Sequence, residues 1–69
     1  MTTFAHAAVR VSAAPRAETL ALAARRYAGV VPGAAPWTSP PMVEARARLF
    51  MAELRAAGCE AEVIEADHG

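Results

Sequence analysis

The chain has 69 residues, of which 55% are hydrophobic, and its seven arginines balance seven acidic side chains to give a net charge of zero at pH 7. A chain of this length forms one small domain, predicted over residues 1–69, and its neutral total argues against a general binder of nucleic acid or membranes. Much of the hydrophobic fraction is alanine, which buries little area. We therefore expect a marginally stable monomer that forms a homodimer or joins a larger assembly.

The single cysteine and the N-terminal residues predict the cellular location of the protein. Cys59 is the single cysteine, so the chain forms no internal disulfide, and a reducing cytoplasm is the natural setting. The start, MTTFAHAAVR, has neither the cationic residues nor the continuous apolar core of a signal peptide, and no stretch approaches the roughly 20 apolar residues of a membrane span. We expect a cytoplasmic protein without membrane contact.

The first half of the chain predicts a strand and then a helix. Residues 3–11 alternate, with Val9 and Val11 on one side, which is typical of a strand. A helix is predicted over residues 14–28, with Ser12 as its N-terminal cap and Gly29 as the left-handed residue just past its end.

The second half predicts a connector, a helix and a strand. Residues 29–38 form a connector stiffened by proline and glycine, and a helix over 40–57 follows with Ser39 or Thr38 as N-cap. Gly58 ends this helix and a strand spans 59–66. The helix buries a stripe at alternating spacings of four and three, made of Val43, Ala47, Phe50, Leu54 and Ala57.

These elements predict an α/β (α+β) domain in the order β-α-α-β, with the pair of helices on one face of a short two-stranded sheet. Cys59, Ala61 and Val63 should face the helices, and Glu62 would lie across from Arg10 if the two strands pair. Whether the strands run parallel or antiparallel, and whether they pair within one chain or between chains, stays open. Two strands leave open edges, which favours assembly with a copy or a partner.

The titratable residues do not predict an enzyme. Cys59 would need a cationic neighbour to become a nucleophile, but Glu60 follows it, so a buried small residue is the preferred interpretation. His6 and His68 lie at opposite ends and have no metal-ligand spacing. We expect no cofactor and no metal. The acidic residues near the end predict a solvated strand face, or a face that mimics phosphates for a basic partner: Glu60, Glu62, Glu65 and Asp67.

The function that these features favour is a non-enzymatic subunit, adaptor or inhibitor that docks on a protein or macromolecular complex. Large apolar residues off the predicted helix stripes, a loop tryptophan and an arginine provide the contact surface. The predicted partner-binding residues are Leu22, Trp37, Met42, Leu49 and Arg46. A loop tryptophan more often covers the core than it binds a partner, so a core role for Trp37 is the alternative.

A second hypothesis comes from the segments HAAVRVSAAPRAETLALAARRYAG and SPPMVEARARLFMAELRAAG. Together they resemble a ribbon–helix–helix protein, in which a strand pairs with its copy in a dimer and enters the DNA major groove. The resemblance implies DNA contacts from Arg10 and His6, and from Ser39 near a phosphate. The neutral charge ranks nucleic acid below protein as the partner.

Overall fold

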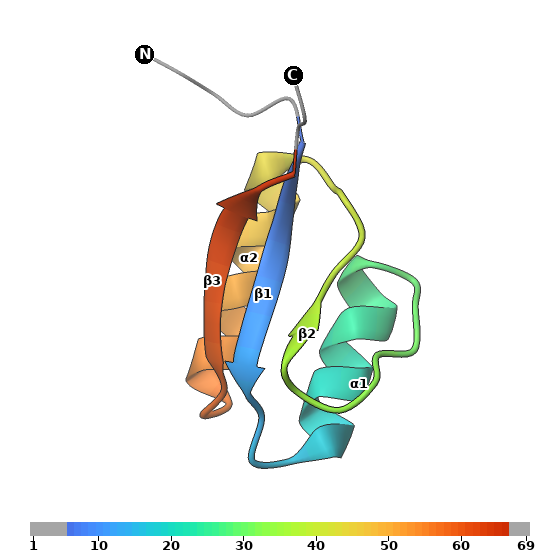
Figure 1. Cartoon of the computed structure of the whole chain (residues 1–69), viewed down its shortest axis with the longest axis vertical. Helices are drawn as coiled ribbons and strands as arrows, with labels where there is room; N and C mark the ends of the chain where they lie inside the picture. Colours follow the sequence, from blue (N-terminus) through green and yellow to red (C-terminus); the bar gives the residue numbers. More distant parts are fainter. Residues whose placement is uncertain (1–5, 67–69) are drawn as a thin grey trace.

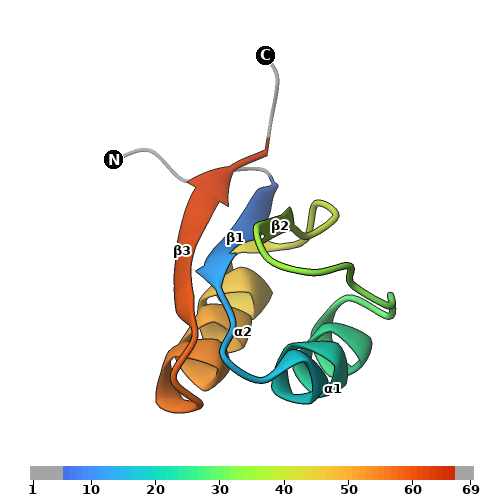
Figure 2. The same cartoon turned by 60° about the horizontal axis from the view of Figure 1, so that its bottom comes forward.

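Strand β1 lies at the centre of a small antiparallel sheet. Within residues 6–66, the part of the chain that the computed structural model describes, the sheet has three strands in the order β2-β1-β3. Helix α2 packs across β1 and β3, helix α1 packs against α2, and both helices lie on the same face of the sheet (Figure 1 and Figure 2). The elements are, in chain order, β1 (Ala7–Ala13), α1 (Ala17–Tyr27), β2 (Trp37–Thr38), α2 (Glu44–Ala56) and β3 (Glu60–Glu65).

The structure confirms a mixed α/β domain with two helices on one face of a sheet, and it corrects the order to β-α-β-α-β. The sheet has three strands instead of the expected two because Trp37 and Thr38, assigned to the connector, pair with Val11 and Arg10. A strand of two residues leaves no alternating pattern to detect in the sequence.

The terminal strands pair antiparallel and within one chain. Arg10 lies directly across from Glu62, as predicted, and the two side chains form an ion pair on the open face of the sheet. Residues 3–5 of the predicted first strand lie outside the described residues, and β1 continues past residue 11 to Ala13 through an irregularity in the pairing. Ala13 pairs with Glu60, so this extension lengthens the contact between β1 and β3.

Both helices are shorter at their N-terminal ends than predicted. The N-caps are Arg16 and Val43, and neither helix has a side-chain cap, so the predicted caps, Ser12 for α1 and Ser39 or Thr38 for α2, are wrong. The segment before α2 stays extended because Met42 exchanges two main-chain hydrogen bonds of 2.7 Å with Ala7. The helix therefore begins at Glu44.

Both helices end at their C-termini where the sequence predicts. Gly29 and Gly58 have φ of 67° and 92°, which confirms them as the left-handed residues that end α1 and α2. In α2 Glu44 and Arg48 are four residues apart, a spacing in the sequence that predicts a favourable helical ion pair, and the pair is present at 2.8 Å. Local sequence was sufficient here because each of these features depends on neighbouring residues only.

Phe50 forms the centre of the core. Its ring is fully buried, stacks on Tyr27 with centroids 5.5 Å apart, and meets the edge of Trp37 at 6.4 Å. These contacts join α1, β2 and α2, so one aromatic ring holds three elements together. Around it lie the other fully buried large side chains: Val9, Val11, Leu20 and Leu54.

Ser39 connects β1 to the segment that follows β2. Its side chain is only 5% exposed, and its hydroxyl accepts a hydrogen bond of 2.9 Å from the N–H of Val9 and donates to the carbonyl of Pro40 at 3.0 Å. Its own N–H donates to the Val9 carbonyl at 2.9 Å. The serine thus completes the hydrogen bonding of β1 where the ladder with β2 has ended.

We predict that Ser39→Ala lowers the free energy of unfolding by about 1–3 kcal/mol, because the buried N–H of Val9 loses its acceptor. Urea denaturation followed by circular dichroism measures the change. Ser12→Ala is the matched control, since the Ser12 side chain is exposed, and it should be close to neutral. Equal effects for the two serines would contradict the role given to the Ser39 hydroxyl.

A second prediction concerns the end of α2. Gly58→Ala should destabilise the fold by about 1–2 kcal/mol, the cost of the left-handed conformation for a residue with a Cβ. Apart from its chain neighbours, no described heavy atom lies within 4 Å of that Cβ, so the loss measures backbone strain alone. Gly33→Ala, where φ is not in that region and the space is also open, should leave thermal stability nearly unchanged.

Candidate docking surface

An apolar groove lies where the end of α1 meets the start of α2. It has a volume of about 400 Å³ and opens to solvent. Its walls are mainly apolar, with two arginines at the rim, and the lining residues are Arg26, Tyr27, Val43, Ala45, Arg46 and Leu49. A surface of this kind suits an apolar side chain from another molecule.

Helix geometry explains why two large apolar side chains remain in solvent here. Phe50 faces the core, and Leu49, one residue earlier, is rotated by about 100° around the helix axis. Leu49 is therefore 61% exposed, and Val43, which precedes the first helical residue, is 64% exposed. Val43 was predicted on the buried stripe, which is wrong because the helix starts too late to include it.

Polar contacts hold the two helices together beside the groove. Arg26 Nη1 donates to Glu53 Oε1 at 3.0 Å, and Arg46 Nη1 donates to the carbonyl of Tyr27 at 3.2 Å. The second bond satisfies a main-chain carbonyl at the C-terminal end of α1, where cations are favoured. Among the described residues Arg46 forms no ion pair with a carboxylate, so the rim of the groove carries positive charge.

The groove contains two of the predicted partner-binding residues, Leu49 and Arg46. Leu22 is 68% exposed but does not line it. Met42 is 8% exposed and belongs to the core, and Trp37 is half-buried against Phe50, so both contribute mainly to the fold. The contributions of Arg26, Tyr27, Val43 and Ala45 were not predicted, because they depend on how α1 and α2 pack.

The structure places the three residues of the DNA-binding hypothesis differently: His6 and Arg10 are exposed, whereas Ser39 is buried. Arg10 is exposed on the open face but is paired with Glu62, and the Ser39 hydroxyl is buried and bonded to main chain. Moreover, β1 is paired on both sides within the chain. It is therefore unable to pair with the same strand of a second copy, which a ribbon–helix–helix dimer requires.

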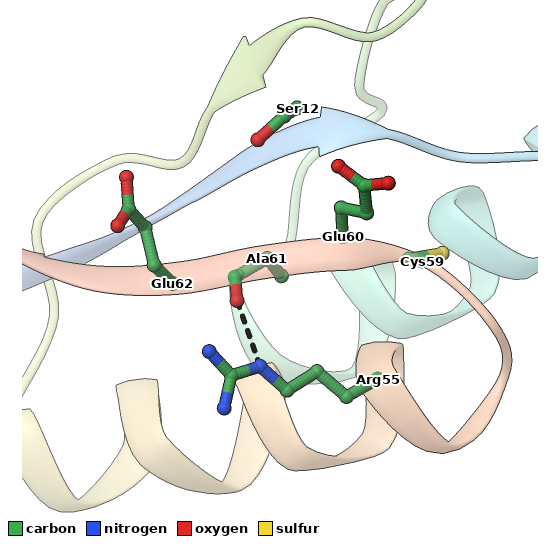
Figure 3. Close-up of a pocket in the computed structure, with 6 residues that line it drawn as sticks. All are labelled: Ser12, Arg55, Cys59, Glu60, Ala61 and Glu62. Carbon is green, nitrogen blue, oxygen red and sulfur yellow. Dashed lines mark hydrogen bonds between the residues drawn. The ribbon is translucent and has the colours of Figure 1, made fainter.

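A second, polar hollow lies at the edge of β3. Arg55 from α2 extends alongside the strand and its Nε donates to the carbonyl of Ala61 at 2.9 Å, while Glu60 and Glu62 project on the other side of the strand (Figure 3). Ser12 and Cys59 complete the lining. The hollow therefore lies over a strand edge that is partly covered by one guanidinium group.

Cys59 faces the core, as predicted, together with Ala61 and Val63. Its thiol is free and buried, and burial raises its pKa above the ordinary value. A protonated, buried thiol is a poor nucleophile, because the reactive form is the thiolate.

The described residues provide neither a metal-binding cluster nor a membrane-spanning helix. Residues 6–66 contain no group of three or more His, Cys, Asp or Glu side chains that are close enough to hold a metal ion. Neither α1 nor α2 has the length and apolar character that would let it cross a membrane. Comparison with known proteins finds no match to the chain among family models, curated proteins or solved structures.

We predict that a disulfide reagent such as Ellman's reagent modifies native Cys59 slowly at neutral pH and modifies it rapidly in denaturant, because only unfolding exposes the thiolate.

The raised pKa of Cys59 also makes the stability of the fold depend on pH. As pH rises through the ordinary thiol pKa, the unfolded chain ionises first, so the free energy of unfolding falls. Cys59→Ala should remove this part of the alkaline loss, and an unchanged pH profile would contradict it.

Proposed function

We propose that this protein is a non-enzymatic docking protein that binds a larger protein partner through the groove between α1 and α2. The supporting observation is the exposure of Val43 and Leu49, each more than three-fifths accessible, beside an apolar groove. A chain of 69 residues in which five of the twelve core-cluster residues are alanine has few large apolar residues. Leaving two of them in solvent at one place costs stability that a partner would restore.

The groove favours a particular partner chemistry. Its apolar walls accept a large apolar side chain, and the guanidinium groups of Arg26 and Arg46 favour a carboxylate next to that side chain. Arg26 is already paired with Glu53, whereas Arg46 donates only to a main-chain carbonyl, so Arg46 is the stronger candidate for the contact. We expect the partner to present an apolar anchor flanked by an acidic residue.

Site-specific photocrosslinking tests this proposal. The photoreactive amino acid p-benzoylphenylalanine is placed at position 49 in one variant and at position 22 in another, and each is irradiated in cells. Both positions are exposed leucines on helices, but only Leu49 lines the groove. A discrete adduct of higher mass from position 49, absent from position 22, is the expected result.

Two substitutions then measure the contribution of each feature. Leu49→Ser and Arg46→Glu should each weaken binding of the captured partner about tenfold or more, which corresponds to about 1.4 kcal/mol. Leu22→Ser should leave the affinity unchanged. Adducts of equal intensity from positions 49 and 22, or no adduct from either, would contradict the groove as the docking surface.

A further inference from the structure

The outer edge of β3 carries main-chain groups that have no partner among the described residues. In an antiparallel pair, the N–H and C=O groups of each residue point alternately toward the neighbouring strand and away from it. The N–H and C=O groups of Ala7 and Val9 point toward the β2 side, where they form hydrogen bonds with Met42 and Ser39. In β3, Glu65 lies opposite Ala7 and Val63 lies opposite Val9. The N–H and C=O groups of these two residues therefore point away from β1 and into solvent.

Arg55 confirms this orientation and limits the free edge. The Ala61 carbonyl belongs to the same alternating set, and it accepts its hydrogen bond from Arg55 Nε on the side away from β1 (Figure 3). The guanidinium group thus covers the start of the edge. The N–H and C=O groups of Val63 and Glu65 stay without a hydrogen-bond partner among the described residues. These four groups lie along one edge with the spacing that an added strand needs.

Charge decides which strand fits this edge. Three of the six residues of β3 are glutamates, Glu60, Glu62 and Glu65, and within residues 6–66 only Glu62 of these three is in an ion pair. Pairing with the β3 of a second copy would bring carboxylates close to carboxylates, which is unfavourable across strands. An extended segment with alternating basic and apolar residues would place cations on the face of Glu60 and Glu62, which project on the same side of the strand (Figure 3), and apolar side chains on the other face beside the half-buried Val63.

We propose that β3 accepts an extended, basic segment of a partner protein as a fourth strand of the sheet. This surface differs from the groove between the helices, because β3 and α1 lie at opposite sides of the molecule (Figure 1). The inference is independent of the proposed function.

Amide hydrogen exchange of the whole protein, followed by NMR, tests the inference with the peptide acetyl-Lys-Val-Lys-Val-Lys-Val-Lys-amide. In the free protein the amides of Glu62 and Ile64, bonded to β1, should exchange slowly, and those of Val63 and Glu65 should exchange fast. At a peptide concentration ten times its Kd, exchange at Val63 and Glu65 should slow about tenfold, because only the free fraction exchanges.

Four controls make the result specific. The peptide acetyl-Glu-Val-Glu-Val-Glu-Val-Glu-amide should give no protection, and Glu60→Lys should weaken binding of the lysine peptide. Val63→Pro removes the outward N–H and should abolish binding, and Glu60→Lys provides the test if the proline variant does not fold. Leu49→Ser should bind the lysine peptide normally, so a failure of the groove proposal and a failure of this one are distinguishable.

Several outcomes would overturn the inference. Unchanged exchange at Val63 and Glu65 with peptide up to about 1 mM, a concentration that corresponds to about −4.1 kcal/mol of binding, would show that the edge does not accept this strand. Protection of the same two amides that rises with protein concentration alone would show that a second copy occupies the edge. Equal protection by the acidic peptide would remove the role of charge.

Discussion

The structure depends on the requirement that β1 satisfies its main-chain hydrogen bonds on both sides. On one side β3 provides a regular ladder. On the other side the strand partner is only two residues long, so Ser39 and Met42 supply the remaining bonds to Val9 and Ala7. A buried N–H or C=O without a partner costs about 1–3 kcal/mol, which is a large fraction of the stability of a small domain.

This constraint fixes the path of the chain between the helices. Because residues 37–42 must lie extended against β1, Trp37 is carried over the core to meet Phe50, and α2 starts only at Glu44. Val43 is then left at the corner, outside both the sheet and the helix, and it forms one side of the groove. The exposed apolar surface is thus a consequence of how the sheet is completed.

The same constraint separates two surfaces of different character. With β1 occupied on both sides, β3 is left as an edge strand with an acidic sequence, and only Arg55 covers part of that edge. The groove between α1 and α2 is apolar with arginines at its rim. One small domain therefore offers a basic-rimmed apolar surface on one side and an acidic hydrogen-bonding edge on the other.

Sequence alone determined the features that depend on neighbouring residues. The alternation around Val9 and Val11, the helix ends at Gly29 and Gly58, and the pair of Glu44 with Arg48 were all readable, because backbone conformation and side-chain spacing are local properties. The pairing of Arg10 with Glu62 also followed, once the terminal strands were assumed to pair.

Only the tertiary structure decided the rest. The strand at Trp37 and Thr38, the buried position of Ser39 and the late start of α2 arise from hydrogen bonds to β1, which is distant along the chain. A serine followed by two prolines has the signature of a helix start, and nothing local reveals that its hydroxyl is used by another strand. Both candidate surfaces follow from those long-range contacts, so the sequence identified Leu49 and Arg46 but not the groove that unites them.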